Sequence, residues 1–110
     1  MEINVRSLSI VFETRIYIKS GGEIVGSKGL IAILEAISDK GSINKAAKSL
    51  NINYKRVWLR ISRAEKLLGR KLLLRKLGRK GVELTEYGKQ IIKSYRALED
   101  MLKKNLPSSM

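Results

Sequence analysis

The sequence contains no cysteine and no histidine among its 110 residues. Without cysteine, the chain can form no disulfide, no thiolate metal site and no CxxC redox pair. Without histidine, it lacks the usual general base and the commonest metal ligand, and Ser-His triads are impossible. We therefore expect no catalytic site, no bound metal and no cofactor.

Long apolar runs are also missing. The longest, Leu30–Leu34, is far too short to span a bilayer, and the first residues, MEINVRS, do not resemble a signal peptide. We therefore expect a cytoplasmic protein with no membrane partner. An apolar fraction of 44% and a charged fraction of 30% are typical of a folded domain with a modest core.

Acidic residues are nearly absent from one continuous part of the chain. From Lys40 to Gly81 there are fourteen lysines and arginines but one acid, Glu65. The chain has 23 basic and 10 acidic residues, so the formal net charge of +13 belongs to this basic window alone. Such segregation is typical of a surface that binds a polyanion. Nucleic acid is favoured over a membrane surface, which would require a broad, bulky apolar face.

Within the basic window, Gly41–Leu68 predicts a helix-turn-helix. Ser42 is a suitable N-cap for the first helix. Apolar residues then recur at helical spacing: Ile43, Ala46, Ala47 and Leu50. Asn51 can adopt the left-handed conformation that ends a helix, and Asn53 can cap the longer helix that starts at Tyr54.

The second helix of this unit has two unlike faces at about 100° per residue. The apolar face is expected to be buried and consists of Val57, Trp58, Ile61, Ala64 and Leu68. The opposite face carries Lys55, Arg56, Leu59, Arg63 and Lys66, with Arg60 at its margin. These faces fit a helix that lies in the major groove of DNA. A solvated basic face is the alternative, and the segregation of charge favours the first interpretation.

The part before the basic window predicts a hairpin and a helix. Apolar and polar residues alternate over Ser7–Lys19, which indicates a strand. Ser20–Glu23 can turn the chain into a short return strand, Glu23–Val25. This hairpin could lie on the core or reach a partner, and the structural role is favoured. The helix that follows ends near Asp39, and its buried stripe should be Leu30, Ile33, Leu34 and Ile37.

The part after the second helix predicts a wing. Leu72–Leu74 and Val82–Leu84 indicate two short strands, joined by the basic, glycine-rich loop Leu77–Gly81. The tip of this loop, Arg79 and Lys80, is expected to reach a phosphate or the minor groove. A mobile loop with incidental charge is the alternative. The segment GRKG lacks the spacing of a nucleotide-binding P-loop.

The last predicted helix starts at the N-cap Thr85 and continues to about Lys103. Its apolar residues form one narrow seam, at i, i+4, i+7 and i+11: Ile91, Tyr95, Leu98 and Leu102. Such a seam pairs with a second subunit or folds back on its own core. Dimerisation is favoured, because three helices are expected to complete the core. The chain would then comprise a hairpin arm (1–26), a winged helix-turn-helix domain (27–84) and a dimerisation helix (85–110).

The segment GSINKAAKSLNINYKRVW (41–58) closely resembles the winged-helix DNA-binding domain of the molybdate-responsive bacterial and archaeal regulators. In that family a Gly-Ser-Ile opening, an Ala-Ala or Gly-Ala pair and a Ser-Tyr-Lys-x-x-Trp start to the recognition helix recur. The last motif stands here as NYKRVW (53–58), with asparagine in place of serine. The later LTEYG (84–88) is similar to a Leu-Thr-x-x-Gly motif that LysR-type regulators share.

This resemblance implies a mainly α (α+β) winged helix-turn-helix fold, dimerisation through the flanking helices and a role in transcription. Full-length members carry C-terminal molybdate-binding domains, which this sequence does not contain. Oxyanion sensing is therefore not carried over, and no small-molecule effector is expected. The wing is also shorter and more basic than is usual in that family.

The leading hypothesis is a homodimer that binds a defined sequence of double-stranded DNA and regulates transcription. The residues expected at the DNA are Ser42, Lys45, Lys48, Asn53, Tyr54, Lys55, Arg56, Leu59, Arg60, Arg63, Lys66, Arg79 and Lys80. Among them, Arg56 is assigned a bidentate contact to guanine. The alternative is an architectural protein that coats DNA without sequence preference. RNA binding is less favoured because aromatic residues are few, and catalysis because no paired carboxylates accompany a cleft-forming motif.

Overall fold

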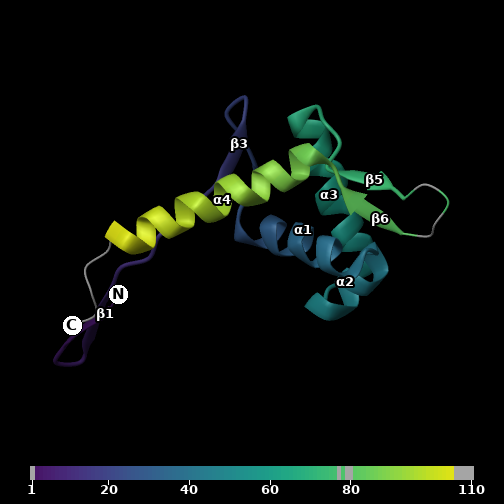
Figure 1. The fold of residues 1–110 in the computed structure, drawn as a ribbon. Helices are drawn as coiled ribbons and strands as arrows, with labels where there is room; N and C mark the ends of the chain where they lie inside the picture. The colour runs from purple at the N-terminus through teal and green to yellow at the C-terminus, as the bar shows by residue number, and fades with distance from the viewer. Residues whose placement is uncertain (1, 77, 79–80, 106–110) are drawn as a thin grey trace.

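The computed structural model describes residues 2–76, 78 and 81–105. In this part of the chain two β-hairpins come first, three helices follow, and a third two-stranded antiparallel sheet separates them from the last helix (Figure 1). The strands are β1 (Glu2–Val5), β2 (Leu8–Val11), β3 (Ile18–Ser20), β4 (Glu23–Gly26), β5 (Leu73–Arg75) and β6 (Val82–Leu84). The helices are α1 (Lys28–Lys40), α2 (Ile43–Leu50), α3 (Tyr54–Leu68) and α4 (Glu86–Asn105). None of the helices in these described residues is both long and apolar enough to cross a membrane.

The hydrophobic core lies where α1, α2 and α3 meet the base of the β5–β6 sheet. The stripe predicted for α1 is buried: Leu30, Ile33, Leu34 and Ile37. Ala46 and Ala47 of α2 are buried as well, and their small side chains let α2 approach its neighbours closely. α3 contributes Val57, Ile61 and Ala64. The predicted packing of these three helices around one core is therefore confirmed, and Leu72 and Leu84 extend the core to the base of the wing.

The predicted capping residues set the boundaries of the helix-turn-helix. The backbone N–H of Lys45 donates to Ser42 Oγ over 3.1 Å, and the N–H of Lys55 donates to Asn53 Oδ1 over 2.8 Å. Between the two helices, Asn51 has a φ of 55°, the left-handed conformation that ends α2. A side-chain cap of this kind stabilises a helix by about 1 kcal/mol. The caps also fix where α3 begins and hence the directions of its side chains.

The N-terminal region differs from the single strand predicted over Ser7–Lys19. Two hairpins form instead: β1 pairs with β2, β3 pairs with β4, and residues 12–17 between them belong to no strand. The β3–β4 hairpin agrees with the predicted turn and return strand. The alternation already begins with Ile3 and Val5, which lie in β1. Residues 8–11 form an antiparallel pair with residues 2–5. A period of two identifies extended chain but specifies neither its partner nor its break points.

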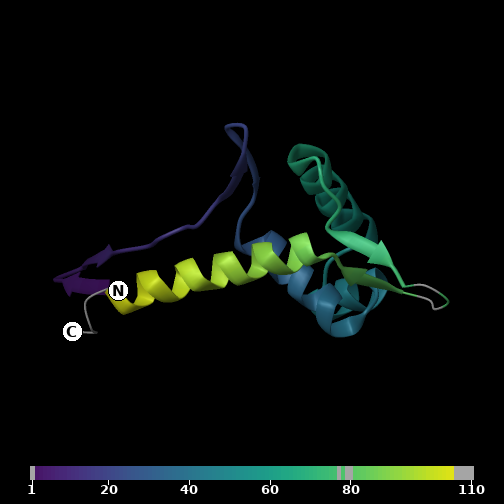
Figure 2. The ribbon, with the colours of Figure 1, turned by 45° about the horizontal axis from the view of Figure 1, so that its top comes forward.

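α4 packs on the core more extensively than the sequence suggested. Thr85 caps it as predicted, because its Oγ1 accepts from the N–H of Gly88 over 3.0 Å. Ile91 packs against the core cluster, and Tyr95 is only 6% exposed. The expectation that three helices complete the core is therefore wrong. The second half of α4, where Leu98 is 45% exposed, extends away from the other helices (Figures 1 and 2).

Arg96 ties α4 to α1. Its Nε donates to Glu35 Oε2 over 3.1 Å, its Nη2 is paired with Oε1 of the same carboxylate, and its Nη1 donates to Glu99 Oε1 over 2.7 Å. These hydrogen bonds, first those to Glu35 and then that to Glu99, raise the pKa of Arg96, and the bond from Arg96 lowers the pKa of Glu99. Glu35 of α1 thus holds α4 in place.

Candidate nucleic-acid interface

α3 presents a basic face to solvent. Its apolar residues Val57, Ile61 and Ala64 are buried and hold the helix on the core. The residues predicted for the opposite face are all exposed: Lys55, Arg56, Leu59, Arg60, Arg63 and Lys66. Tyr54, in the first turn, is exposed beside them. Because one side of α3 is fixed by packing, the charged side is presented in a defined orientation.

The basic residues of α3 do not all face the same neighbours. Arg63 Nη1 donates to the carbonyl oxygen of Val25 in β4 over 3.4 Å. Arg60 Nη1 lies 2.7 Å from the position that a Cβ on Gly29 would occupy. These two arginines therefore lie toward the β3–β4 hairpin and the start of α1, which stand beside α3 (Figure 2). Tyr54, at the amino end of α3, lies toward the wing.

A groove of about 780 cubic ångströms lies between the first turn of α2, the start of α3 and the two wing strands. The described charged residues that line it are all cationic: Lys40, Lys45, Arg75 and Lys76. The amino end of α2, at Ser42, also lines the groove and adds the partial positive charge of a helix N-terminus. We call this site the basic groove. Lysine, arginine and a helix amino end are together the groups that bind phosphate oxygens.

A backbone contact holds the wing against the helix-turn-helix. The N–H of Val82 donates to the carbonyl oxygen of Gly41 over 3.0 Å. Gly81 has a φ of 115°, and a Cβ at this position would lie 2.4 Å from the Gly41 oxygen. Both the backbone conformation and the close approach require glycine. This contact fixes Arg75 and Lys76 relative to α2, and so fixes the width of the basic groove.

Glu65, the single acid of the basic window, has a structural role. Its Oε2 accepts hydrogen bonds from the N–H groups of Leu72, over 2.7 Å, and Leu73, over 3.3 Å. Its side chain is only 15% exposed, and Lys71 Nζ lies 3.8 Å from Oε1. The carboxylate therefore joins α3 to the start of the wing. Its negative charge is directed at backbone donors and does not interrupt the basic surface.

The structure gives the predicted residues of α2 and the turn three different positions. Ser42 and Asn53 act as helix caps, and Ser42 also lines the basic groove. Lys45 and Tyr54 line the groove directly. Lys48 is exposed on α2 and is not among the residues that line the groove.

Part of the site was missed, and part lies outside the described residues. Lys40, Arg75 and Lys76 belong to the basic window, but they were not predicted at the site. Their signal was the charge count alone, since nothing local shows that the end of α1 faces the wing. Arg79 and Lys80 are not among the described residues, so their role at the wing tip stays a prediction.

Trp58 was predicted on the buried face of α3, and this is wrong. Trp58 is 48% exposed, and it borders a cavity of about 300 cubic ångströms together with Ile43 and Leu74. Trp58 follows Val57 by about 100° on the helix surface, at the edge of the apolar stripe. At that edge, periodicity does not decide whether a large side chain is covered. The side chain lies between α3 and the wing rather than under α1.

A three-helix core, a second helix of the pair with an exposed basic face, and an antiparallel strand pair beside it define a winged helix-turn-helix module. The family model described as "Bacterial regulatory helix-turn-helix protein, lysR family" matches residues 29–89. The chain belongs to this family.

The chain is also similar to two proteins named ModE. It is 43% identical over 72 residues to "Molybdenum transport protein ModE" of Azotobacter vinelandii, which covers 63% of this chain and 27% of that protein. It is 36% identical over 72 residues to "Transcriptional regulator ModE" of Haemophilus influenzae, covering 63% of this chain and 28% of that protein. The resemblance stated from the sequence is therefore confirmed. The matched region spans little more than a quarter of either relative.

Solved structures agree on the fold. The CbnR_DBD–DNA complex superposes with a TM-score of 0.57 at 24% identity, covering 69% of this chain and 85% of that chain. ArgP from Mycobacterium tuberculosis superposes with a TM-score of 0.54 at 27% identity, covering 68% of this chain and 27% of that chain. The predicted winged helix-turn-helix fold is therefore confirmed.

Proposed function

We propose that this chain binds double-stranded DNA with sequence preference and regulates transcription. One observation carries the proposal: α3 presents an exposed basic face, and Tyr54 in its first turn also lines the basic groove. Two relatives support it. The Haemophilus influenzae protein is described as a transcriptional regulator, and the similar CbnR_DBD domain was solved in a complex with DNA.

The two parts of this surface have different tasks in the proposal. The basic groove binds backbone phosphates, because its cations and the amino end of α2 converge on one space. α3 enters the major groove, where Lys55, Arg56 and Leu59 reach base edges. Phosphate contacts set the register and orientation of the protein, and the side chains of α3 provide the sequence preference.

Selection of bound duplexes from random DNA, followed by footprinting, tests sequence preference. We expect a recurring sequence made of two half-sites about one helical turn, roughly 34–36 Å, apart if the protein binds as a two-fold dimer. Strong binding without any enriched sequence would favour the architectural alternative, to which the all-cationic basic groove is also suited. That outcome would refute the sequence-reading role of α3.

Arg56 is the sharpest test of base recognition. Arg56→Gln should cost about 1–3 kcal/mol on the selected site and relax the preference at one base pair. On random duplexes it should act only through the loss of one charge. Lys48→Gln is the matched control: it removes one exposed charge outside the basic groove and should affect both DNAs equally. Fluorescence anisotropy gives the four dissociation constants. If Arg56→Gln also weakens both DNAs equally, Arg56 does not read a base.

We further propose that the protein acts as a homodimer through the exposed half of α4. Ile91 and Tyr95 of the predicted seam are engaged with their own core, and Leu102 is half-buried, which leaves Leu98 as the exposed residue of the seam. Met101, 59% exposed, widens this apolar surface. The parts of the chain outside the basic window are neutral, so contact there brings two copies together away from their repelling cationic faces.

The double substitution Leu98→Lys and Met101→Lys should raise the dimer dissociation constant by about 10²-fold or more, because it places unpaired charges in the interface. Sedimentation velocity over a range of concentrations measures the change. Asp100→Lys, on another side of the same helix, is the control and should leave the dimer intact. A monomer before any substitution, or an unchanged dimer after it, would refute this interface.

A further inference from the structure

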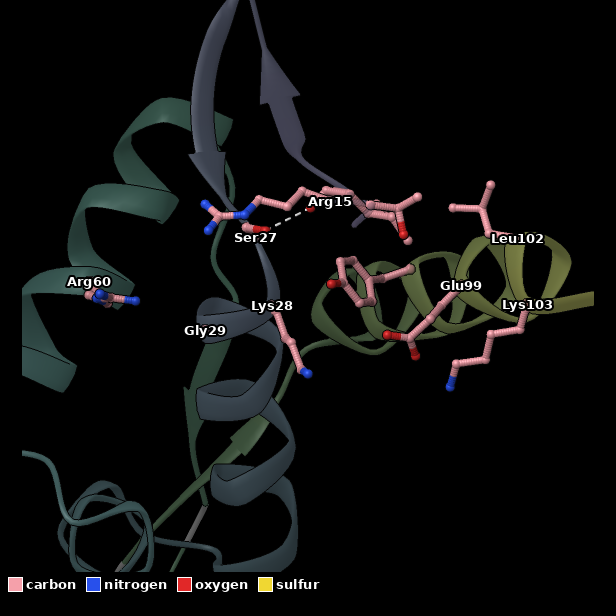
Figure 3. Close-up of a pocket in the computed structure, with 11 residues that line it drawn as sticks. Arg15, Ser27, Lys28, Gly29, Arg60, Glu99, Leu102 and Lys103 are labelled. Carbon is pink, nitrogen blue, oxygen red and sulfur yellow. Dashed lines mark hydrogen bonds between the residues drawn. The ribbon is translucent and has the colours of Figure 1, made fainter. Parts of the chain in front are cut away.

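A second cavity, of about 550 cubic ångströms, opens at the amino end of α1 (Figure 3). It is lined by residues 14–16, by the first turn of α1, by Arg60 of α3 and by the second half of α4. It shares no lining residue with the basic groove, which lies at the carboxyl end of the same helix. The 13 residues of α1 separate the two sites by about 20 Å. We call this second site the α1–α4 cavity.

Positive charge accumulates around the α1–α4 cavity. Four cationic side chains line it: Arg15, Lys28, Arg60 and Lys103. Within the described residues, no carboxylate lies within ion-pair distance of any of them. Glu99 is the one acid in the lining, and it accepts a hydrogen bond from Arg96, which lowers its pKa. The four cations of the lining therefore outnumber its one carboxylate, which is bound to Arg96 and also interacts with Lys28 and Lys103.

The position of Arg60 adds to this surplus. Gly29 leaves room for the guanidinium, because a Cβ there would lie 2.7 Å from Arg60 Nη1. The guanidinium thus lies against the first turn of α1, the positive end of the helix dipole, and that turn contains no acidic residue. A cation at this end of a helix is unfavourable. An anion between Arg60 and the first-turn N–H groups would make both interactions favourable.

Tyr95 provides a second, independent indication. Its side chain is only 6% exposed and lines the α1–α4 cavity, yet its hydroxyl has no hydrogen-bond partner among the described residues. Among the described residues only Ser62 Oγ is both buried and unpaired, so the Tyr95 hydroxyl is open to the cavity and available to a bound molecule. Ile16 and Leu102 supply apolar surface next to it. The cavity therefore combines cationic groups, one free hydroxyl and an apolar wall.

We propose that the α1–α4 cavity binds a small organic anion. Its carboxylate or phosphate group would lie between Arg60, Lys28 and the first turn of α1, and its apolar body against Ile16, Leu102 and the ring of Tyr95. The volume is within the usual range of small-molecule sites, about 300–1,000 cubic ångströms. Because Arg60 projects from α3, occupancy changes the charge that α3 presents, so the bound anion would act as an effector of the proposed DNA binding.

Phenyl phosphate is a suitable probe, since it joins an anionic group to an apolar ring. Titrated into the ¹⁵N-labelled full chain, it should produce saturable amide shifts at Ile16, Lys28 and Gly29. Inorganic phosphate and phenol each contain one half of the probe and should bind at least about tenfold more weakly. Lys28→Gln and Arg15→Gln should each raise the dissociation constant about tenfold, and Tyr95→Phe should raise it about threefold or more. Lys45→Gln, in the basic groove, is the matched control and should leave it unchanged.

Two outcomes would overturn the proposal. Equal shifts at Lys45 and Tyr54, or no change in the dissociation constant for both Lys28→Gln and Arg15→Gln, would show unspecific attraction of an anion to a basic protein. Duplex DNA that reproduces the shifts at Lys28 and Gly29 would assign the cavity to DNA phosphate instead. The titration with phenyl phosphate contains no DNA, so its failure leaves the proposed DNA binding untouched.

Discussion

Replacing Lys45, Arg75 and Lys76 together with glutamine should weaken binding to duplex DNA by about 10²–10³-fold at 0.1 M salt. These three side chains line the basic groove, and the contact between Gly41 and Val82 holds the wing that carries two of them. Each lost phosphate contact removes the release of about 0.9 counterion. The slope of log K against log salt should therefore become shallower by about 2.7, and specific and random DNA should be affected alike.

A matched variant separates this local effect from bulk charge. Lys19→Gln, Lys93→Gln and Lys104→Gln together remove the same three charges from exposed positions outside the basic window. This control should reduce affinity by less than about tenfold and change the slope by less than about one, since screening weakens charges more than a Debye length, about 10 Å, from the DNA. Anisotropy titrations at four salt concentrations give both quantities. Equal losses in the two triple variants would show that the basic groove is not the phosphate-binding site.

Gly81→Ala should lower the free energy of unfolding by about 2–4 kcal/mol. The new methyl group would collide with the carbonyl oxygen of Gly41, and the φ of 115° at residue 81 is strained for any residue with a side chain. Such strain costs about 1–3 kcal/mol, and separating the two backbones weakens the hydrogen bond from Val82, worth about 0.5–1.5 kcal/mol. The wing should then move away from α2, so DNA affinity should fall as well.

Gly78→Ala is the control for the backbone term alone. Gly78 also has a positive φ, of 68°, but no atom lies within 4 Å of the position of its Cβ. Its substitution should therefore cost only about 1–2 kcal/mol, the usual cost of a left-handed backbone conformation. Urea unfolding followed by circular dichroism measures both variants. If the two cost the same, the close approach to Gly41 does not hold the wing.

The features predicted well from the sequence are those decided by neighbouring residues. Ser42, Asn51 and Asn53 end or begin helices through contacts within four residues, and the structure confirms all three. The core-facing residues of α1 follow from helical periodicity in the same way. The fold class needed little more, because short strands after a helix-turn-helix leave few arrangements.

The features that the sequence did not predict depend on segments far apart in the chain. The basic groove forms only because Lys40 meets the strands after α3, and Lys40 is 35 residues from Arg75 in the sequence. The seam of α4 has a similar ambiguity. Its spacing suits a partner helix and its own core equally, and Ile91 and Tyr95 are used by the core. Periodicity identifies an apolar stripe but not what covers it.

The half-exposed indole of Trp58 has a practical consequence. Trp58 is the single tryptophan of the chain, and it borders a cavity that Leu74 and Arg75 of β5 also line. Indole emission responds to the polarity of its surroundings, and this indole lies at the junction of α3 and β5. The protein thus carries its own fluorophore where the wing meets α3, so that a movement of the wing on binding a duplex can be followed by emission wavelength without any attached dye.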